Sequence, residues 1–243
     1  MDIKKLLKEL GLTWMAENVD AVLAASKERK ASPAEALGRL LDGEREARLA
    51  RSVQRRLRAA KVPVARSLAD FNWAWPKKID KDMVMDIFRF GFLKDYGNVV
   101  FMGGVGLGKT FLSSALAIEA CGRNIPTLFT TTVDMVNNLQ AAAARGCLAK
   151  AVKTYTAPQL LHCDEFGYLP VDQQGAHLLF QVISGRCEKG STIVTTNKPY
   201  RQWTSTLAND AALTAALLDR LAGNCKTVVI EGDSYRMRDK IDS

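Results

Sequence analysis

Gly103-Gly-Val-Gly-Leu-Gly-Lys-Thr110 is the most informative stretch of this chain of 243 residues. One glycine, four residues and then Gly-Lys-Thr is the spacing of a P-loop, whose glycines let successive backbone N–H groups turn inward around phosphates. In such a loop Lys109 reaches the β- and γ-phosphates, and the hydroxyl of Thr110 holds Mg²⁺. The motif therefore predicts a nucleoside triphosphate site that uses Mg²⁺. The residues assigned to nucleotide binding are Gly103, Gly104, Val105, Gly106, Leu107, Gly108, Lys109, Thr110 and Phe111.

The residues on both sides of the P-loop agree with this interpretation. Residues 98–102 form a short apolar run that predicts a buried strand, and residues 110–121 are rich in alanine and leucine and predict a helix. A strand, a glycine-rich turn and a helix in this order place a phosphate at the positive end of the helix dipole.

Beyond the P-loop helix, apolar runs alternate with helical patterns. Further strands are predicted at 126–131, 159–163, 191–196 and 226–230, and further helices at 133–145, 174–188 and 211–221. Parallel strands need crossover connections, and helical crossovers cover both faces of the sheet. The predicted fold class is therefore α/β, with a five-stranded parallel sheet and helices on both faces, in a domain that spans residues 66–243.

Residues 1–65 are predicted to form a small helical domain of their own. Apolar residues recur there at helical spacing, and Ser32-Pro33 has the composition of a helix start. The next segment carries Phe71, Trp73 and Trp75 before Pro76. Three aromatic residues favour a segment that packs on the following domain. A surface for nucleobases is the alternative.

The composition is that of a globular protein, with 47% hydrophobic and 25% charged residues. The formal net charge of +8 favours a polyanionic partner. Apolar runs stay well below the length of about 18 residues that a membrane span requires, and a signal-type segment does not follow the first residues. The expected location is the cytoplasm, without a membrane partner. The five cysteines are scattered, which argues against zinc and disulfides.

A run of arginines between residues 44 and 61 carries much of the positive charge. Several of them follow helical spacing and would form one basic stripe. Most charge runs are solvated surface faces, but an excess of one sign favours contact with nucleic acid. The residues assigned to DNA contact are Arg45, Arg48, Arg51, Arg55, Arg56 and Arg58.

Two adjacent carboxylates follow the apolar run 159–163. Ligands of open α/β sheets bind at the carboxyl ends of the strands, so Asp164 and Glu165 are expected beside the phosphates. Asp164 would then orient Mg²⁺ together with Thr110, and Glu165 would polarise the attacking water. This assignment predicts a hydrolase and not only a nucleotide-binding module.

Three further polar residues are candidates for the same chemistry. Asn197 ends the strand that follows the carboxylates, where its amide could bridge the γ-phosphate and the lytic water; a turn-forming asparagine is the alternative. Arg220 and Arg236 are candidates for stabilising transition-state charge, in the same subunit or in a neighbouring one. The catalytic set is thus Lys109, Glu165, Asn197, Arg220 and Arg236.

The order and spacing of these motifs resemble the AAA+ ATPases of the initiator and helicase-loader group. The stretches 164–175, 179–184 and 190–197 closely resemble the IstB family, the ATP-binding helpers of insertion-sequence transposition. The resemblance implies that Asn197 is similar to sensor 1, Arg220 to the arginine finger that reaches a neighbouring subunit's ATP, and Arg236 to sensor 2. Because the chain ends soon after Arg238, it also implies a minimal or absent C-terminal lid.

Two functions are compatible with these features. In the first, the protein is an ATP-dependent regulator of DNA transposition. It self-associates on duplex DNA with little sequence preference, hydrolyses ATP with Mg²⁺, and recruits or stimulates a transposase. In the second, it is a replicative helicase loader of the DnaC type that acts mainly through protein–protein contacts. The first 65 residues separate the two, because a loader does not need a basic N-terminal domain.

Overall fold

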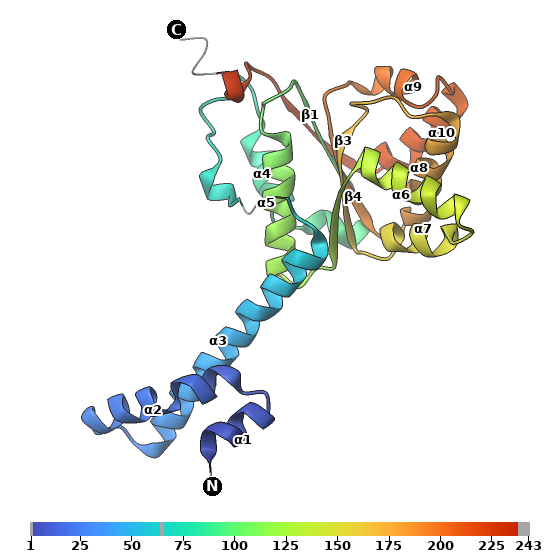
Figure 1. Ribbon diagram of the computed structural model, residues 1–243. Coiled ribbons are helices and arrows are strands. Elements are labelled where there is room, and N and C mark those ends of the chain that lie inside the picture. Colours follow the sequence, from blue (N-terminus) through green and yellow to red (C-terminus); the bar gives the residue numbers. More distant parts are fainter. Residues whose placement is uncertain (1, 64–65, 238–243) are drawn as a thin grey trace. The chain divides into compact units, whose positions relative to one another are not determined.

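The computed structural model describes residues 2–63 and 66–237 (Figure 1). Its backbone contacts divide the chain into two compact units, Met1–Arg55 and Arg56–Ser243. The predicted domain boundary, after residue 65, lies ten residues beyond the division after Arg55, and residue 65 is outside the described residues.

The N-terminal unit is helical, with α1 (Ile3–Glu9), α2 (Thr13–Glu28) and most of α3 (Pro33–Ala60). Helix α3 begins at Pro33, as predicted, and Glu35 and Ser32 cap it reciprocally. The Ser32 N–H donates to Glu35 Oε2 at 2.7 Å, and the Glu35 N–H donates to Ser32 Oγ at 3.3 Å. The buried core of this unit is small and consists mainly of Met15, Val19 and Leu40.

The second unit contains a five-stranded parallel sheet in the order β2-β3-β4-β1-β5. This arrangement confirms the predicted fold class. The strands are β1 (Asn98–Gly103), β2 (Thr127–Thr131), β3 (Leu160–Phe166), β4 (Ser191–Thr196) and β5 (Cys225–Ile230). Strand β1, which leads into the P-loop, lies between β4 and β5. The P-loop is thus held by an interior strand.

Helices cover both faces of the sheet (Figure 1). Helices α4 and α5 lie on one face, and α6 to α10 lie on the other. Their bounds are α4 (Lys81–Ile87), α5 (Lys109–Gly122), α6 (Thr132–Ala144), α7 (Leu148–Thr156), α8 (Gln173–Arg186), α9 (Trp203–Thr206) and α10 (Ala211–Ala222). Short 3₁₀ turns occur at Leu68–Asp70, Gly91–Asp95, Tyr200–Gln202 and Tyr235–Met237.

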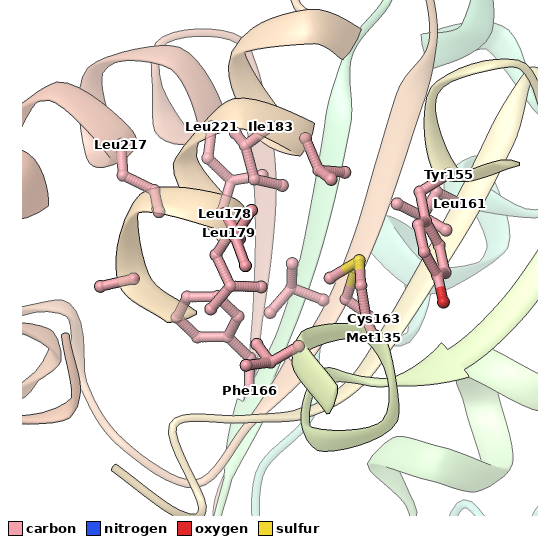
Figure 2. Packing of buried hydrophobic residues seen from close by; sticks show 14 of the residues in the cluster. Met135, Tyr155, Leu161, Cys163, Phe166, Leu178, Leu179, Ile183, Leu217 and Leu221 are labelled. Atoms are coloured by element: carbon pink, nitrogen blue, oxygen red, sulfur yellow. The ribbon is translucent and has the colours of Figure 1, made fainter. Parts of the chain in front are cut away.

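Alternate residues of each central strand enter the two cores. In β3, Leu160 packs on the α5 side, whereas Leu161 and Cys163 pack on the α8 side. Figure 2 shows the second core, where Leu161 and Cys163 from the sheet lie with Met135 of α6 and Leu179 of α8. The strands therefore carry apolar side chains on both faces, as expected for a covered parallel sheet.

Two differences from the predicted elements bear on the site. Strand β3 continues to Phe166, three residues beyond the predicted end, so that Asp164 and Glu165 belong to the strand. Helices α4, α7 and α9 were not predicted. Among the described residues, none of the helices combines the length and the apolar character that crossing a membrane requires.

Candidate nucleotide site

The P-loop adopts backbone angles that need glycine. Gly106 and Gly108 have φ values of 77° and 87°, in the region that side chains disfavour. A Cβ atom on Gly108 would lie 2.7 Å from Cε2 of Phe71, and one on Gly106 would lie 2.1 Å from Oγ of Ser234. The loop is therefore enclosed on both sides, and neither glycine can be replaced without strain.

Helix α5 begins at Lys109 without a side-chain cap, because its N-cap residue is Gly108. Its first-turn N–H groups are left for an anion, which the helix dipole also favours. The Lys109 ammonium donates to the carbonyl oxygen of Gly104 at 2.6 Å, across the loop. The cation thus lies over the cradle in which a phosphate would bind.

Asp164 and Thr110 form an oxygen-rich corner beside the loop. The Thr110 hydroxyl donates to Oδ1 of the buried Asp164 at 3.0 Å. A carboxylate and a hydroxyl are hard oxygen donors, and Mg²⁺ in nucleotide sites uses one or two such ligands together with phosphate oxygens. A cluster of three or more His, Cys, Asp or Glu side chains that could hold a metal by itself does not occur among the described residues. The corner fits Mg²⁺ that arrives with a nucleotide.

Glu165 follows on a bulge of β3. The register with β4 shifts between Cys163 and Phe166, and Glu165 has a φ of 57°, which is uncommon for a residue other than glycine. Its backbone N–H donates to Oγ1 of Thr195 on β4 at 3.0 Å, and its side chain is exposed. Both Glu165 and Asp164 line the same cleft as the P-loop.

This cleft has a volume of about 870 Å³, within the range of small-molecule sites. Beside the P-loop it is lined by the end of β2, by residues of the segment 61–76 and by Tyr235. Phe71 packs edge-on against Phe111 with ring centres 5.4 Å apart, and Trp75 packs against Tyr235 at 5.2 Å. The aromatic segment thus packs on the domain, as predicted, and also lines the cleft.

His162 lies two residues before Asp164 on β3 and, like Asp164, contacts a side chain of helix α5. One of its ring nitrogens, Nδ1, is 2.9 Å from the Ser113 hydroxyl, and its ring stacks on Phe129. Complete burial, with a smaller effect of the nearby Arg186, lowers the pKa of His162 to about 3. The imidazole is therefore neutral at physiological pH, and strand β3 is joined to α5 by two polar contacts.

Of the other predicted catalytic residues, neither Asn197 nor Arg220 is among the described residues that line this cleft. Asn197 directly follows β4, with an exposed side chain. Arg220 lies on α10, where it donates to the Ala216 carbonyl at 2.9 Å and covers the Phe180 ring. Arg236 belongs to the turn Tyr235–Met237, and its side chain lies outside the described part of the structure.

Arg220 is at the opposite end of β1 from the P-loop. Asn98, the first residue of β1, donates its side-chain amide to the carbonyl of Leu221 at 3.0 Å. There Arg220 lines a smaller hollow of about 290 Å³. The structure therefore brings Lys109, Thr110, Asp164 and Glu165 together but does not bring Arg220 to them.

Four of the six arginines assigned to DNA contact have partners within the chain. Arg45 pairs with Asp42 at 3.0 Å. Arg48 and Arg51 both donate to the buried carboxylate of Glu44, at 3.3 Å and 2.8 Å. In the second unit, Arg56 donates to the carbonyl of Cys121 and to the side chain of Asn124. The remaining two, Arg55 and Arg58, are exposed on α3.

Comparison with known protein families gives one match over nearly the whole chain. A sequence model of IstB-like ATP-binding proteins matches residues 5–243. The chain is 34% identical to the ATP-binding protein of insertion sequence IS5376 from Geobacillus stearothermophilus, over 98% of this chain and 94% of the relative. It is 29% identical to the IS21 ATP-binding protein from Pseudomonas aeruginosa, over 98% of this chain and 90% of the relative.

Solved structures show the same fold at lower identity. AMPPCP-bound DnaA from Aquifex aeolicus is similar with a TM-score of 0.60 at 16% identity, over 75% of this chain but only 56% of that chain. The DnaC helicase loader is similar with a TM-score of 0.53 at 20% identity, over 71% of this chain and 97% of that one. These similarities establish an AAA+ P-loop fold.

Proposed function

Because the chain belongs to the family of IstB-like ATP-binding proteins, we propose that it regulates DNA transposition. The chain is an ATPase with an AAA+ fold. In the proposed function, ATP binding lets several copies assemble on duplex DNA, the assembly recruits or stimulates a transposase, and hydrolysis dismantles it. The relatives come from insertion sequences, which supports the link to transposition.

One observation carries the ATPase assignment, namely the joint placement of the P-loop, Asp164 and Glu165 around one cleft. Lys109 moves from the Gly104 carbonyl to the phosphates, and the first turn of α5 donates its free N–H groups to them. Thr110 and Asp164 would hold Mg²⁺, which would neutralise charge on the phosphates. Glu165 accepts a proton from the attacking water.

The remaining residues act from outside the cleft of their own subunit or at its edge. Asn197 orients the water from the end of β4. Arg236 contacts the phosphates of its own subunit. Arg220 lies at the opposite end of β1 from the P-loop of its own chain, so in this proposal it serves the nucleotide of a neighbouring copy. Self-association is thus part of the proposed catalysis.

The proposed DNA contact is electrostatic. Arg55 and Arg58 are exposed, and the net charge of the chain is +8. Arginines that contact phosphates bind duplexes of any sequence, with an affinity that falls steeply with salt. The proposal therefore requires little sequence preference.

A helicase loader is the second candidate, and one observation favours it. The N-terminal unit exposes leucines on α3 to about half of their surface or more, with Leu37 and Leu41 at 52% and Leu49 at 60%. Leu37 and Leu41 are one helical turn apart on the same face of α3, and exposed apolar side chains that lie close together mark protein–protein contacts. A protein partner in place of DNA would bind there.

The test is the molar mass of the complex, measured by light scattering after gel filtration. The protein is mixed with a duplex of about 50 base pairs in ADP, in ATP, and in ATP with Glu165→Gln. A large complex that needs both DNA and ATP, and that persists with Glu165→Gln, supports the transposition regulator. A protein that ignores the duplex in every nucleotide state contradicts it and favours the loader.

A further inference from the structure

Thr195 lies next to both carboxylates of the site, on the neighbouring strand. Its side chain is 1% exposed, and its hydroxyl makes two hydrogen bonds to β3. The hydroxyl donates to Oδ1 of Asp164 and accepts the backbone N–H of Glu165 at 3.0 Å. A hydroxyl has one donor hydrogen and two lone pairs, so its single hydrogen is directed at Asp164.

The bulge in β3 explains why a side chain is needed at this point. Cys163 pairs with Val194 and Phe166 pairs with Thr196, so that Asp164 and Glu165 together face the single residue Thr195. An extra residue in one strand disrupts the ladder and leaves backbone groups to be satisfied in another way. The Thr195 hydroxyl takes the Glu165 N–H in place of a backbone carbonyl.

The same bond fixes an uncommon backbone conformation. Glu165 has a φ of 57°, and residues other than glycine hold such angles only where the surroundings impose them. Threonine suits this task because its branched Cβ restricts the side chain to few rotamers. Thr195 therefore sets both the direction in which Glu165 leaves the strand and the orientation of the Asp164 carboxylate.

We propose that Thr195 is a positioning residue for ATP hydrolysis, which aligns Asp164 for Mg²⁺ and Glu165 for the attacking water through one hydroxyl. The inference rests on the roles that the proposed function gives to these two carboxylates. The contacts that align the two carboxylates involve neither DNA nor a transposase nor a second copy, because all three residues belong to one subunit.

The test compares Thr195→Val, which keeps the shape and removes the hydroxyl, with Thr195→Ser, which keeps the hydroxyl. Thr196→Val is the matched control, because Thr196 is equally buried on the same strand and its hydroxyl bonds to the backbone of Lys198 instead. Glu165→Gln is measured alongside. The readouts are kcat and KM for ATP, the Mg²⁺ concentration at half-maximal rate, and binding of a fluorescent ATP analogue in EDTA.

For Thr195→Val we expect kcat to fall by roughly 10- to 100-fold, as small misplacements of catalytic groups do. We also expect half-saturation at a higher Mg²⁺ concentration. Binding in EDTA should stay near the wild-type value, which also shows that the variant is folded. Thr195→Ser should recover most of the rate, and Thr196→Val should match the wild type.

Two results would overturn this inference and leave the proposed function intact. In the first, Thr195→Val hydrolyses ATP at the wild-type rate while Glu165→Gln is inactive. In the second, Thr195→Ser is as impaired as Thr195→Val, which would make the effect one of packing. A Glu165→Gln variant with the wild-type rate would instead overturn the proposed role of Glu165, and the inference with it.

Discussion

Arg51 donates from Nη2 to the buried Oε1 of Glu44 at 2.8 Å, and the other carboxylate oxygen of Glu44 accepts the backbone N–H of Met15 at the start of α2. Although burial raises the pKa of Glu44, the Met15 N–H and the Arg51 guanidinium outweigh it, so the pKa lies below its ordinary value. Arg51 of the basic stripe therefore stabilises the N-terminal unit through Glu44. Substitutions of the different arginines should accordingly differ in their effect on stability.

The first prediction concerns stability. Arg51→Ala leaves the buried carboxylate of Glu44 with one guanidinium fewer, which should lower the free energy of unfolding of the N-terminal unit by about 1–2 kcal/mol. Arg55→Ala should change it by less than about 0.5 kcal/mol, as is usual for exposed residues. Urea denaturation followed by circular dichroism measures both. Equal effects of the two substitutions would contradict the assigned role of Arg51.

The second prediction concerns DNA. Reversing charge at Arg55 and Arg58 together should weaken duplex binding by at least about tenfold and reduce the slope of log affinity against log salt by about 2. ATP binding should not change. Fluorescence anisotropy over a salt series measures the slope. Charge reversal at Arg145 and Arg201, which are also exposed, is the control with the same change in net charge. An equal loss in the control would argue against a localised contact.

The third prediction is a pH dependence of stability that comes from His162. Its folded pKa of about 3 lies below the ordinary value of 6.5, so the unfolded chain binds the proton more readily. The contribution of His162 to the free energy of unfolding is fully present above pH 6.5. It decreases as the pH falls, and about 2 kcal/mol of it is lost at pH 5. Unfolding midpoints at several pH values measure it.

The matched variant for this pH dependence is Ser113→Ala combined with His162→Leu. It removes the titrating group together with its hydrogen-bond partner, so no buried polar atom of the pair is left alone. Its stability should fall less between pH 7 and pH 5 than that of the wild type. Parallel curves for the two proteins would assign the loss to other groups.

The fourth prediction compares substitutions of two glycines, Gly108 at the N-cap of α5 and Gly122 at its last residue. Gly108→Ala places a Cβ at a φ of 87° and 2.7 Å from Phe71, which should lower stability by more than about 1 kcal/mol. It should also weaken nucleotide binding, because Phe71 lines the cleft. Gly122→Ala, at the far end of α5, has open space around it and should be neutral or slightly stabilising. Thermal unfolding and nucleotide titration test both.

The sheet could be predicted from the sequence because its strands are apolar runs between clear breaks. Strand β4 has the predicted bounds, 191–196, and α10 begins at the predicted Ala211 behind the capping Asp210. The end of β3 was placed too early because Asp164 and Glu165 look like loop residues in sequence. In the structure Asp164 pairs with Thr131 of β2, Phe166 pairs with Thr196 of β4, and Thr195 accepts the Glu165 N–H, so the strand continues through both carboxylates.

The site could be predicted where a motif or the carboxyl end of a strand holds it, as for the P-loop and for Asp164 and Glu165. The spacing of Gly103 to Thr110 identifies the P-loop, but the contact of Gly108 with Phe71 depends on tertiary packing between distant segments. The pairing of Arg48 and Arg51 with Glu44 had a visible signal, since residues four and seven apart lie on one helix face. The roles of Asn197, Arg220 and Arg236 stay predictions.

Strand β1 has the P-loop after its last residue and the contact with Leu221 at its first. Six residues of a strand span about 20 Å, so the P-loop and Arg220 of one chain lie about that far apart. If Lys109 and Arg220 both take part in each hydrolysis event, two copies of the protein are needed for each event, and the rate depends on their association. Specific activity would then rise with protein concentration and be lost on dilution, and the terminal molecule of an array would be catalytically incomplete.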